Sequence, residues 1–114
     1  MPYIKVSTNH QFPAQSKDQL LMKLSKFGAI ELGKPEEYVM CVVDESPHLI
    51  FAGTFDPAAF IELKSIGLVE SQTEKLSKGL CEIITRETGI PCERIYIEFK
   101  PVTGKMWGWN SGTF

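Results

Sequence analysis

Four stretches of the chain have the apolar, β-branched and aromatic composition of β-strands: residues 3–8, 38–43, 49–54 and 94–99. In the first stretch the side chains alternate. Tyr and Lys at the first odd-numbered positions would point to one side of a sheet, and Ile and Val at the even-numbered positions to the other. The pattern therefore predicts a sheet built from these four segments.

Between the strands, apolar residues recur at the spacing of an amphipathic helix. One helix is predicted to begin near Ser16, with Gln19 three residues later, and another near Ser71, with Glu74 three residues later. This spacing is typical of a capping box. The apolar stripes of both helices should pack against the sheet. They consist of Leu20, Leu21, Leu24, Phe27 and Gly28 in the first helix and of Leu76, Leu80, Ile83 and Ile84 in the second.

The chain contains an internal repeat, because residues 31–43 and 87–99 carry Glu, Gly, Pro and Glu at the same spacing. In each copy the glycine suits the left-handed residue that ends a helix, and the proline prevents the helix from resuming. A predicted strand follows in both copies. The repeat divides the chain into halves at about 2–46 and 48–100, followed by a tail at 101–114.

Each half has the order strand, helix, strand, and a helix of this length usually joins parallel strands through a right-handed crossover. Two such units side by side predict one α/β (α+β) domain over residues 1–114, with a four-stranded sheet and both helices on one face. The other face would be uncovered. Apolar strand positions and an aromatic tail with Trp107, Trp109 and Phe114 favour its packing against another copy of the chain.

The composition argues against several classes of function. The formal net charge is −2, without the basic surplus of a nucleic-acid-binding surface, and no apolar run is long enough for a membrane span. No secretory signal pattern is visible, so the cytoplasm is the expected location. Cys41, Cys81 and Cys92 form no CxxC pair and are expected to be reduced thiols. His10 and His48 lack the spacing of metal ligands.

Pro2 has two interpretations. A proline lacks the N–H that a sheet ladder needs, so it is tolerated at the first residue of a strand, and position 2 fits that rule. Alternatively, a small residue at position 2 normally allows removal of Met1, which would leave Pro2 with a free secondary amine. Such an amine, held at the end of a buried strand, could act as a base.

The two halves differ within the shared turn, where the first half has Lys34 and the second has Ile90. Lys34 is either a solvated loop cation, as most lysines are, or an anion contact beside a pocket. It leads into the second strand, which is predicted to be parallel to the first, so it could end near the N-terminal amine.

The chain resembles the macrophage migration inhibitory factor family, which includes D-dopachrome tautomerase, within the wider tautomerase superfamily. The resemblance extends almost from end to end. It implies a symmetric trimer of β-α-β-β-α-β subunits whose sheets form a barrel, with an active site at each subunit boundary. The segments that carry it are MPYIKVSTN at the start, GKPEEY at 33–38, SIG at 65–67, RIYIEF at 94–99 and GWNSGTF at 108–114.

The resemblance also implies a cofactor-independent keto–enol tautomerase acting on phenylpyruvate-like or dopachrome-like substrates. Pro2 would move a proton between carbon and oxygen of an α-keto acid, Lys34 would bind the substrate anion, and Ile66 would contribute a backbone contact. No metal or organic cofactor is implied. The expected pocket walls are Tyr38, Trp107 and Phe114, with Tyr96 supplied by a neighbouring subunit.

The chain departs from the family pattern at several positions. Ala58 and Ile61 stand where well-known members have a CxxC pair, so a thiol-oxidoreductase activity is not expected. Glu98 replaces an asparagine that reaches the ligand from the adjacent subunit, and it is either a solvent-facing strand residue or a direct contact. Trp107 replaces a valine near the pocket mouth and would narrow the entrance.

The sequence is compatible with two other functions. One is a cytokine-like protein that binds a receptor and retains a vestigial pocket, and export without a classical signal would accompany that role by family analogy. The other is a hydratase or dehalogenase that uses the same amine, with Glu98 positioning water.

Overall fold

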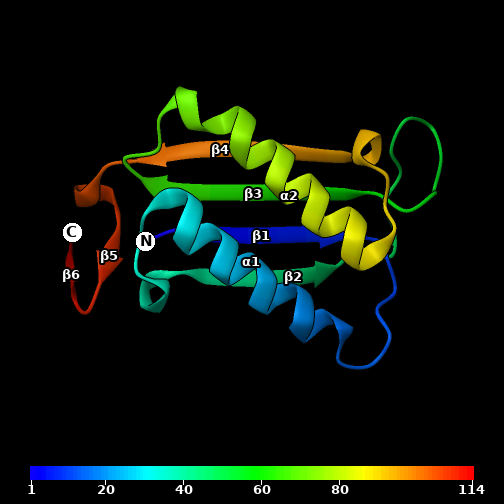
Figure 1. Ribbon diagram of the computed structural model, residues 1–114, viewed down its shortest axis with the longest axis horizontal. Coiled ribbons are helices and arrows are strands. Elements are labelled where there is room, and N and C mark those ends of the chain that lie inside the picture. Colours follow the sequence, from blue (N-terminus) through cyan, green and yellow to red (C-terminus); the bar gives the residue numbers. More distant parts are fainter.

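The computed structural model describes residues 1–114, and Figure 1 shows how its helices and strands follow one another. The elements in chain order are β1 (Tyr3–Thr8), α1 (Ser16–Leu32), β2 (Met40–Glu45), β3 (Ala59–Ile66), α2 (Thr73–Thr88), β4 (Ile95–Val102), β5 (Gly108–Trp109) and β6 (Gly112–Thr113). No helix combines the length and the apolar composition needed to cross a bilayer.

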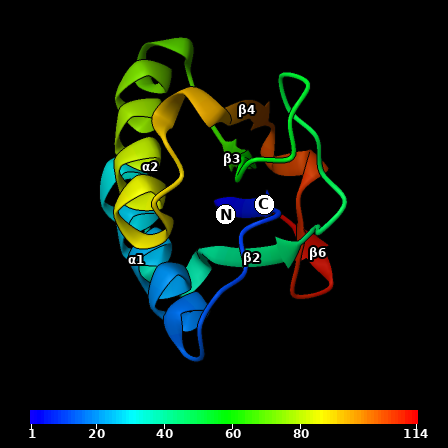
Figure 2. The same cartoon turned by 90° about the vertical axis from the view of Figure 1, so that its right-hand side faces the viewer.

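The main sheet has the order β2-β1-β3-β4. Strand β1 is parallel to β2, β3 is parallel to β4, and β1 is antiparallel to β3. Both helices cover the same face, as Figure 2 shows. The predicted α/β fold of two β-α-β units is therefore confirmed, with the two halves meeting where β1 pairs with β3 at the centre of the sheet.

The strand predicted at residues 49–54 is wrong. That segment contains one isolated bridge, between Phe51 and Thr54, and the two residues between them adopt the positive φ angles of a turn, 53° at Ala52 and 78° at Gly53. The strand before α2 is instead β3. On its outward face, the charged residues Glu62 and Lys64 lie between the apolar residues Phe60 and Ile66, so its sequence lacks a continuous apolar run.

The capping boxes predicted for both helices are also absent. Ser16 Oγ donates a hydrogen bond to Pro13 O at 2.8 Å, and no side chain caps α1 at Gln15. Helix α2 begins later than predicted, and Gln72 Oε1 accepts a hydrogen bond from Val69 N at 3.0 Å in the turn before it. The predicted C-terminal glycines are confirmed, since the residues after both helices have positive φ angles of 63° and 80°.

The core lies between the helices and the sheet face that they cover. The predicted apolar stripes are largely confirmed, because most of their residues are buried there together with alternate residues of the central strands. Leu21, Phe27 and Ile83 are only partly buried at its margin. The residues with essentially no exposed surface include Ile4, Val6, Leu20, Leu24, Ile61, Leu63, Leu76, Leu80 and Ile84.

The sheet face turned away from the helices is charged at its centre. Strand register places Lys5, Glu62 and Glu98 side by side there, and Lys5 Nζ lies 4.0 Å from Asp44 Oδ2. Charged side chains therefore occupy the central row of the face that the helices leave uncovered. The neighbouring rows of that face mix charged and apolar side chains, and the exposed apolar or aromatic ones include Met40, Phe60 and Tyr96.

Candidate functional site

Pro2 lies immediately before β1, at the end of the sheet where the parallel strands β1 and β2 begin. Its side chain is fully buried, and its carbonyl oxygen accepts a hydrogen bond from Met40 N at 3.0 Å. A proline is tolerated there because it precedes the first paired residue of the strand, so no ladder bond needs an N–H from it. The sequence and the fold thus place a buried proline where two parallel strands start.

While Met1 is present, the free amino group lies beside Pro2, on Met1. This amine donates a hydrogen bond to Tyr38 O at 2.7 Å. Burial, and then the Lys34 cation, lower the pKa of the Met1 amine, because both effects disfavour its charged form. The start of the chain is therefore an environment that favours a neutral amine.

A cavity of about 420 Å³ opens at this end of the sheet, and Pro2 is one of its lining residues. Tyr38, Trp107 and Phe114, which the sequence analysis expected as pocket walls, all line it as well. Most of the lining residues are apolar, so the cavity is suited to a ligand with a hydrophobic or aromatic part.

The lining residues that were missed from the sequence include four with polar or aromatic side chains: Tyr3, Glu37, Lys64 and Trp109. Tyr3 and Lys64 are register partners on β1 and β3, and Lys64 Nζ lies 5.7 Å from the centroid of the Tyr3 ring. Only the pairing of these two strands brings Lys64 to the cavity. Trp109 had a visible signal, because the aromatic tail was already recognised as too apolar to remain in water.

The C-terminal hairpin builds an aromatic wall over the cavity. The Tyr38 ring meets the Trp109 ring edge-on at 5.6 Å, and Trp109 stacks on Phe114 at 5.4 Å. Phe114 N donates hydrogen bonds to Gly104 O and Trp107 O, at 3.1 and 3.2 Å, which hold the last residue in place. Figure 1 shows this hairpin beside the N-terminus, so both ends of the chain contribute to one site.

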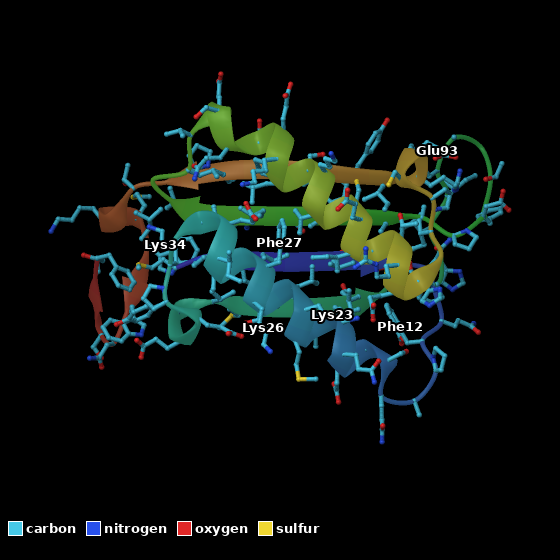
Figure 3. The ribbon with its side chains drawn as sticks, in the orientation of Figure 1. Phe12, Lys23, Lys26, Phe27, Lys34 and Glu93 are labelled. Atoms are coloured by element: carbon cyan, nitrogen blue, oxygen red, sulfur yellow. The ribbon has the colours of Figure 1, made fainter.

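Lys34 and Ile66 lie together in a second, smaller hollow of about 90 Å³. Lys34 follows the left-handed glycine that ends α1, and Figure 3 shows it at the same end of the sheet as the C-terminal hairpin. Ser65 also lines this hollow, where its buried hydroxyl has no hydrogen-bond partner in the chain. A cation and an unpaired hydroxyl are suitable contacts for a carboxylate.

Tyr96 and Glu98 lie outside both of these hollows. Tyr96 packs against Phe51, with ring centroids 4.7 Å apart, and lines a separate apolar hollow of about 240 Å³ with Phe60 and neighbouring residues. Glu98 is exposed and pairs in register with Glu62. Within one chain, the structure therefore does not bring these two expected site residues to Pro2.

No group of histidine, cysteine, aspartate and glutamate residues in the structure is arranged to hold a metal ion. Ala58 and Ile61, at the positions of the absent CxxC pair, are buried core residues. The free cysteines are Cys41, Cys81 and Cys92, and all three lie outside the cavity beside Pro2.

Comparisons with known proteins point to one family. A family model described as macrophage migration inhibitory factor (MIF) matches residues 1–114. The macrophage migration inhibitory factor homolog of Brugia malayi is 39% identical over 120 residues, covering 100% of this chain and 99% of that protein. The macrophage migration inhibitory factor of Xenopus tropicalis is 36% identical over 115 residues, with the same coverage.

Solved structures of proteins similar in sequence also have the fold of this chain. The macrophage migration inhibitory factor homologue from Prochlorococcus marinus has a TM-score of 0.92 and 39% identity, covering 98% of both chains. Pt0534, a protein whose structure was solved after inactivation by 2-oxo-3-pentynoate, has a TM-score of 0.87 and 27% identity, covering 96% of this chain and 93% of its own.

Proposed function

Because this chain belongs to the macrophage migration inhibitory factor family, we propose that it is a cofactor-independent keto–enol tautomerase that uses the amine of Pro2 after removal of Met1. The observation that carries the proposal is the buried position of Pro2 in the wall of an aromatic cavity. Met1 lines the same cavity, so its removal would both free the Pro2 amine and enlarge the space beside it.

The proposed base would work without a metal. Keto–enol interconversion requires removal of a proton from carbon and delivery of one to oxygen, and a single amine can do both in turn. A free proline amine is more basic than most terminal amines. Burial and the Lys34 cation lower the pKa of the Met1 amine, and both would act in the same direction on Pro2. The neutral, proton-accepting form would then be more abundant at neutral pH.

The two hollows suggest how an α-keto acid would bind. Lys34 and the unpaired hydroxyl of Ser65 would hold the carboxylate, beside the backbone of Ile66. The aromatic wall of the larger cavity would hold a phenyl-type side chain, and Lys34 would stabilise enolate charge as it develops. The inhibitor of Pt0534 is itself a 2-oxo acid, which supports this class of ligand for a related fold.

We further propose that the chain assembles as a homotrimer in which a second copy completes each site. Tyr96 lies on an exposed apolar hollow away from Pro2, as expected of a wall that serves a neighbouring subunit. Glu98 would come from the same neighbour. Within one chain Glu98 is exposed on the charged sheet face, in register with Glu62.

The experiment that tests the proposal measures ketonisation of enol-phenylpyruvate by protein whose loss of Met1 has been verified by mass spectrometry. Pro2→Gly replaces the secondary amine of the terminal proline with the primary amine of a terminal glycine. We expect kcat to fall by a factor on the order of 10²–10⁴, with the fold and the assembly unchanged.

Covalent labelling gives a second readout of the same base. 2-Oxo-3-pentynoate carries an alkyne conjugated to its ketone, so a neutral amine can add to it. We expect one adduct per chain on Pro2 of the processed protein. The proposed mechanism would be falsified if the processed parent protein ketonised enol-phenylpyruvate no faster than Pro2→Gly and formed no adduct on Pro2.

Binding to a receptor is the second candidate function. It is supported by the name of the relatives, macrophage migration inhibitory factor, which describes an effect on cells. The exposed aromatic residue Trp109 and the neighbouring exposed Met106 offer an apolar surface at the tail for a protein partner. This role predicts partner binding that survives Pro2→Gly, whereas the enzymatic role predicts loss of turnover in the same variant.

A further inference from the structure

Two cysteines lie close together where the middle of α2 packs against the turn that leads into β4. Cys81 is on α2, and Cys92 begins the short 3-10 helix η3 (Cys92–Arg94), which packs against α2 and leads into β4. Cys81 is half-buried and Cys92 is exposed. Figure 3 labels Glu93, the neighbour of Cys92, at this corner of the molecule, which lies at the opposite end of the sheet from Lys34.

Thr85 holds Cys92 over the turn of α2 that carries Cys81. Thr85 follows Cys81 by four residues, and residues at that spacing are neighbours on one helix face. Thr85 Oγ1 donates a hydrogen bond to Ile90 O at 2.6 Å and lies 3.4 Å from Cys92 Sγ. Because the single hydroxyl proton is directed at Ile90, the Cys92 thiol is the donor in the second contact.

The two thiols also influence each other. Burial, followed by the charge and the hydrogen bond of Cys92, raises the pKa of Cys81 to about 11. Cys81 is therefore protonated at neutral pH and poorly reactive by itself, since the thiolate is the nucleophile. A dissolved oxidant reaches the exposed Cys92 first.

We propose that Cys81 and Cys92 form a reversible intrachain disulfide when the protein meets hydrogen peroxide. The peroxide transfers one oxygen to the Cys92 sulfur, giving a sulfenic acid and one water. The Cys81 sulfur then attacks the Cys92 sulfur. An S–S bond forms as the S–O bond breaks, and the hydroxyl leaves with the Cys81 proton as a second water. A dithiol reductant reverses the reaction by thiol–disulfide exchange, and is itself oxidised.

The disulfide would fix α2 to the start of β4. Arg94 already anchors this corner, because its guanidinium donates hydrogen bonds to the carbonyls of Phe51 and Asp56, at 3.2 and 2.9 Å. The crosslink would reinforce that anchor on the strand that carries Tyr96. Its formation does not depend on the proposed tautomerase activity.

The test treats the purified protein with hydrogen peroxide, alkylates the remaining thiols, and maps its peptides by mass spectrometry without reductant. We expect a linked pair of peptides containing Cys81 and Cys92, and a fall in free thiols from three to one. Dithiothreitol should restore all three. Denaturing gels without reductant should show that the crosslinked product remains a single chain.

Two variants control the experiment. Cys92→Ser keeps a hydroxyl beside Thr85 but should yield no crosslink, whereas Cys41→Ser should crosslink as the parent protein does. The proposal is overturned if the parent protein accumulates Cys92 sulfinic acid, or a disulfide between two chains, while Cys81 remains free to be alkylated.

Discussion

Lys34 influences the amino terminus through space rather than by lining the larger cavity. It lies in the smaller hollow with Ile66, yet its charge contributes to the lowered pKa of the Met1 amine. Under the proposed mechanism one side chain therefore has two effects. It attracts the substrate carboxylate, and it keeps the terminal amine in its neutral form.

The variant Lys34→Met separates these two effects. Removing the cation allows the pKa of the terminal amine to rise, so a smaller fraction of the amine is neutral at a given pH. We expect the acidic limb of the profile of kcat/KM against pH to move to higher pH, and kcat/KM at its maximum to fall by roughly tenfold to a hundredfold.

Lys105→Met is the matched control for this measurement, because it removes an exposed lysine that lines neither hollow. Its pH profile should coincide with that of the parent protein. An acidic limb that stays in place in Lys34→Met would contradict the electrostatic role of Lys34.

The two helices approach each other at a glycine. A Cβ built on Gly79 of α2 would overlap the ring of Phe27 on α1, and Figure 3 shows Phe27 in the region where the helices meet. Glycine costs helix stability relative to alanine, by about 1 kcal/mol. The close contact with the ring explains why this position nevertheless lacks a side chain.

A double-mutant cycle at Gly79 and Phe27 tests this packing. Gly79→Ala gains helix propensity but must displace the ring, whereas in a Phe27→Ala background the same change should stabilise the protein by about 1 kcal/mol. We expect a coupling of about 1 kcal/mol or more between the two positions, measured by denaturant unfolding. Additive effects within error would show that the ring moves aside without cost.

At the scale of the whole molecule, the expected site residues are divided between two ends of one sheet. Pro2, Lys34 and the aromatic wall gather where β1 and β2 begin, whereas Tyr96 lies at the start of β4 on a different hollow. Strand β1 is antiparallel to β3, whereas β4 is parallel to it. The first residues of β1 and β4 therefore lie at opposite ends of the strands of the sheet. A site that contains both Pro2 and Tyr96 therefore requires two chains.

Subunit complementation tests this conclusion. A chain with Pro2→Gly, coexpressed with a chain carrying Tyr96→Ala, should form mixed assemblies in which some sites combine an intact Pro2 with an intact Tyr96. We expect activity above that of either variant alone. Coexpression of Pro2→Gly with Lys34→Met is the control and should give no recovery, since Pro2 and Lys34 come from the same chain. The shared site would be refuted if activity recovered in the control pair but not in the pair that combines Pro2→Gly with Tyr96→Ala.

The sequence by itself determined several local features of this protein, although not the helix N-caps or the structure of residues 49–54. The repeated glycine and proline predicted where both helices end, and the period of apolar residues predicted which helix faces are buried. These predictions succeeded because they depend on neighbours within one or two turns of the chain. The resemblance to a family, carried by short motifs along the whole length, added the expected roles of Pro2 and Lys34.

The tertiary structure decided what depends on pairing between distant segments. Strand β3 was missed because two of its four outward positions, Glu62 and Lys64, are charged and interrupt the apolar pattern. Only its pairing with β1 brings Lys64 beside Tyr3 at the cavity. The contact of Cys92 with Thr85 likewise depends on how the chain turns after α2. Strand register and turn geometry are cooperative properties of the folded chain, so no local pattern of residues encodes them separately.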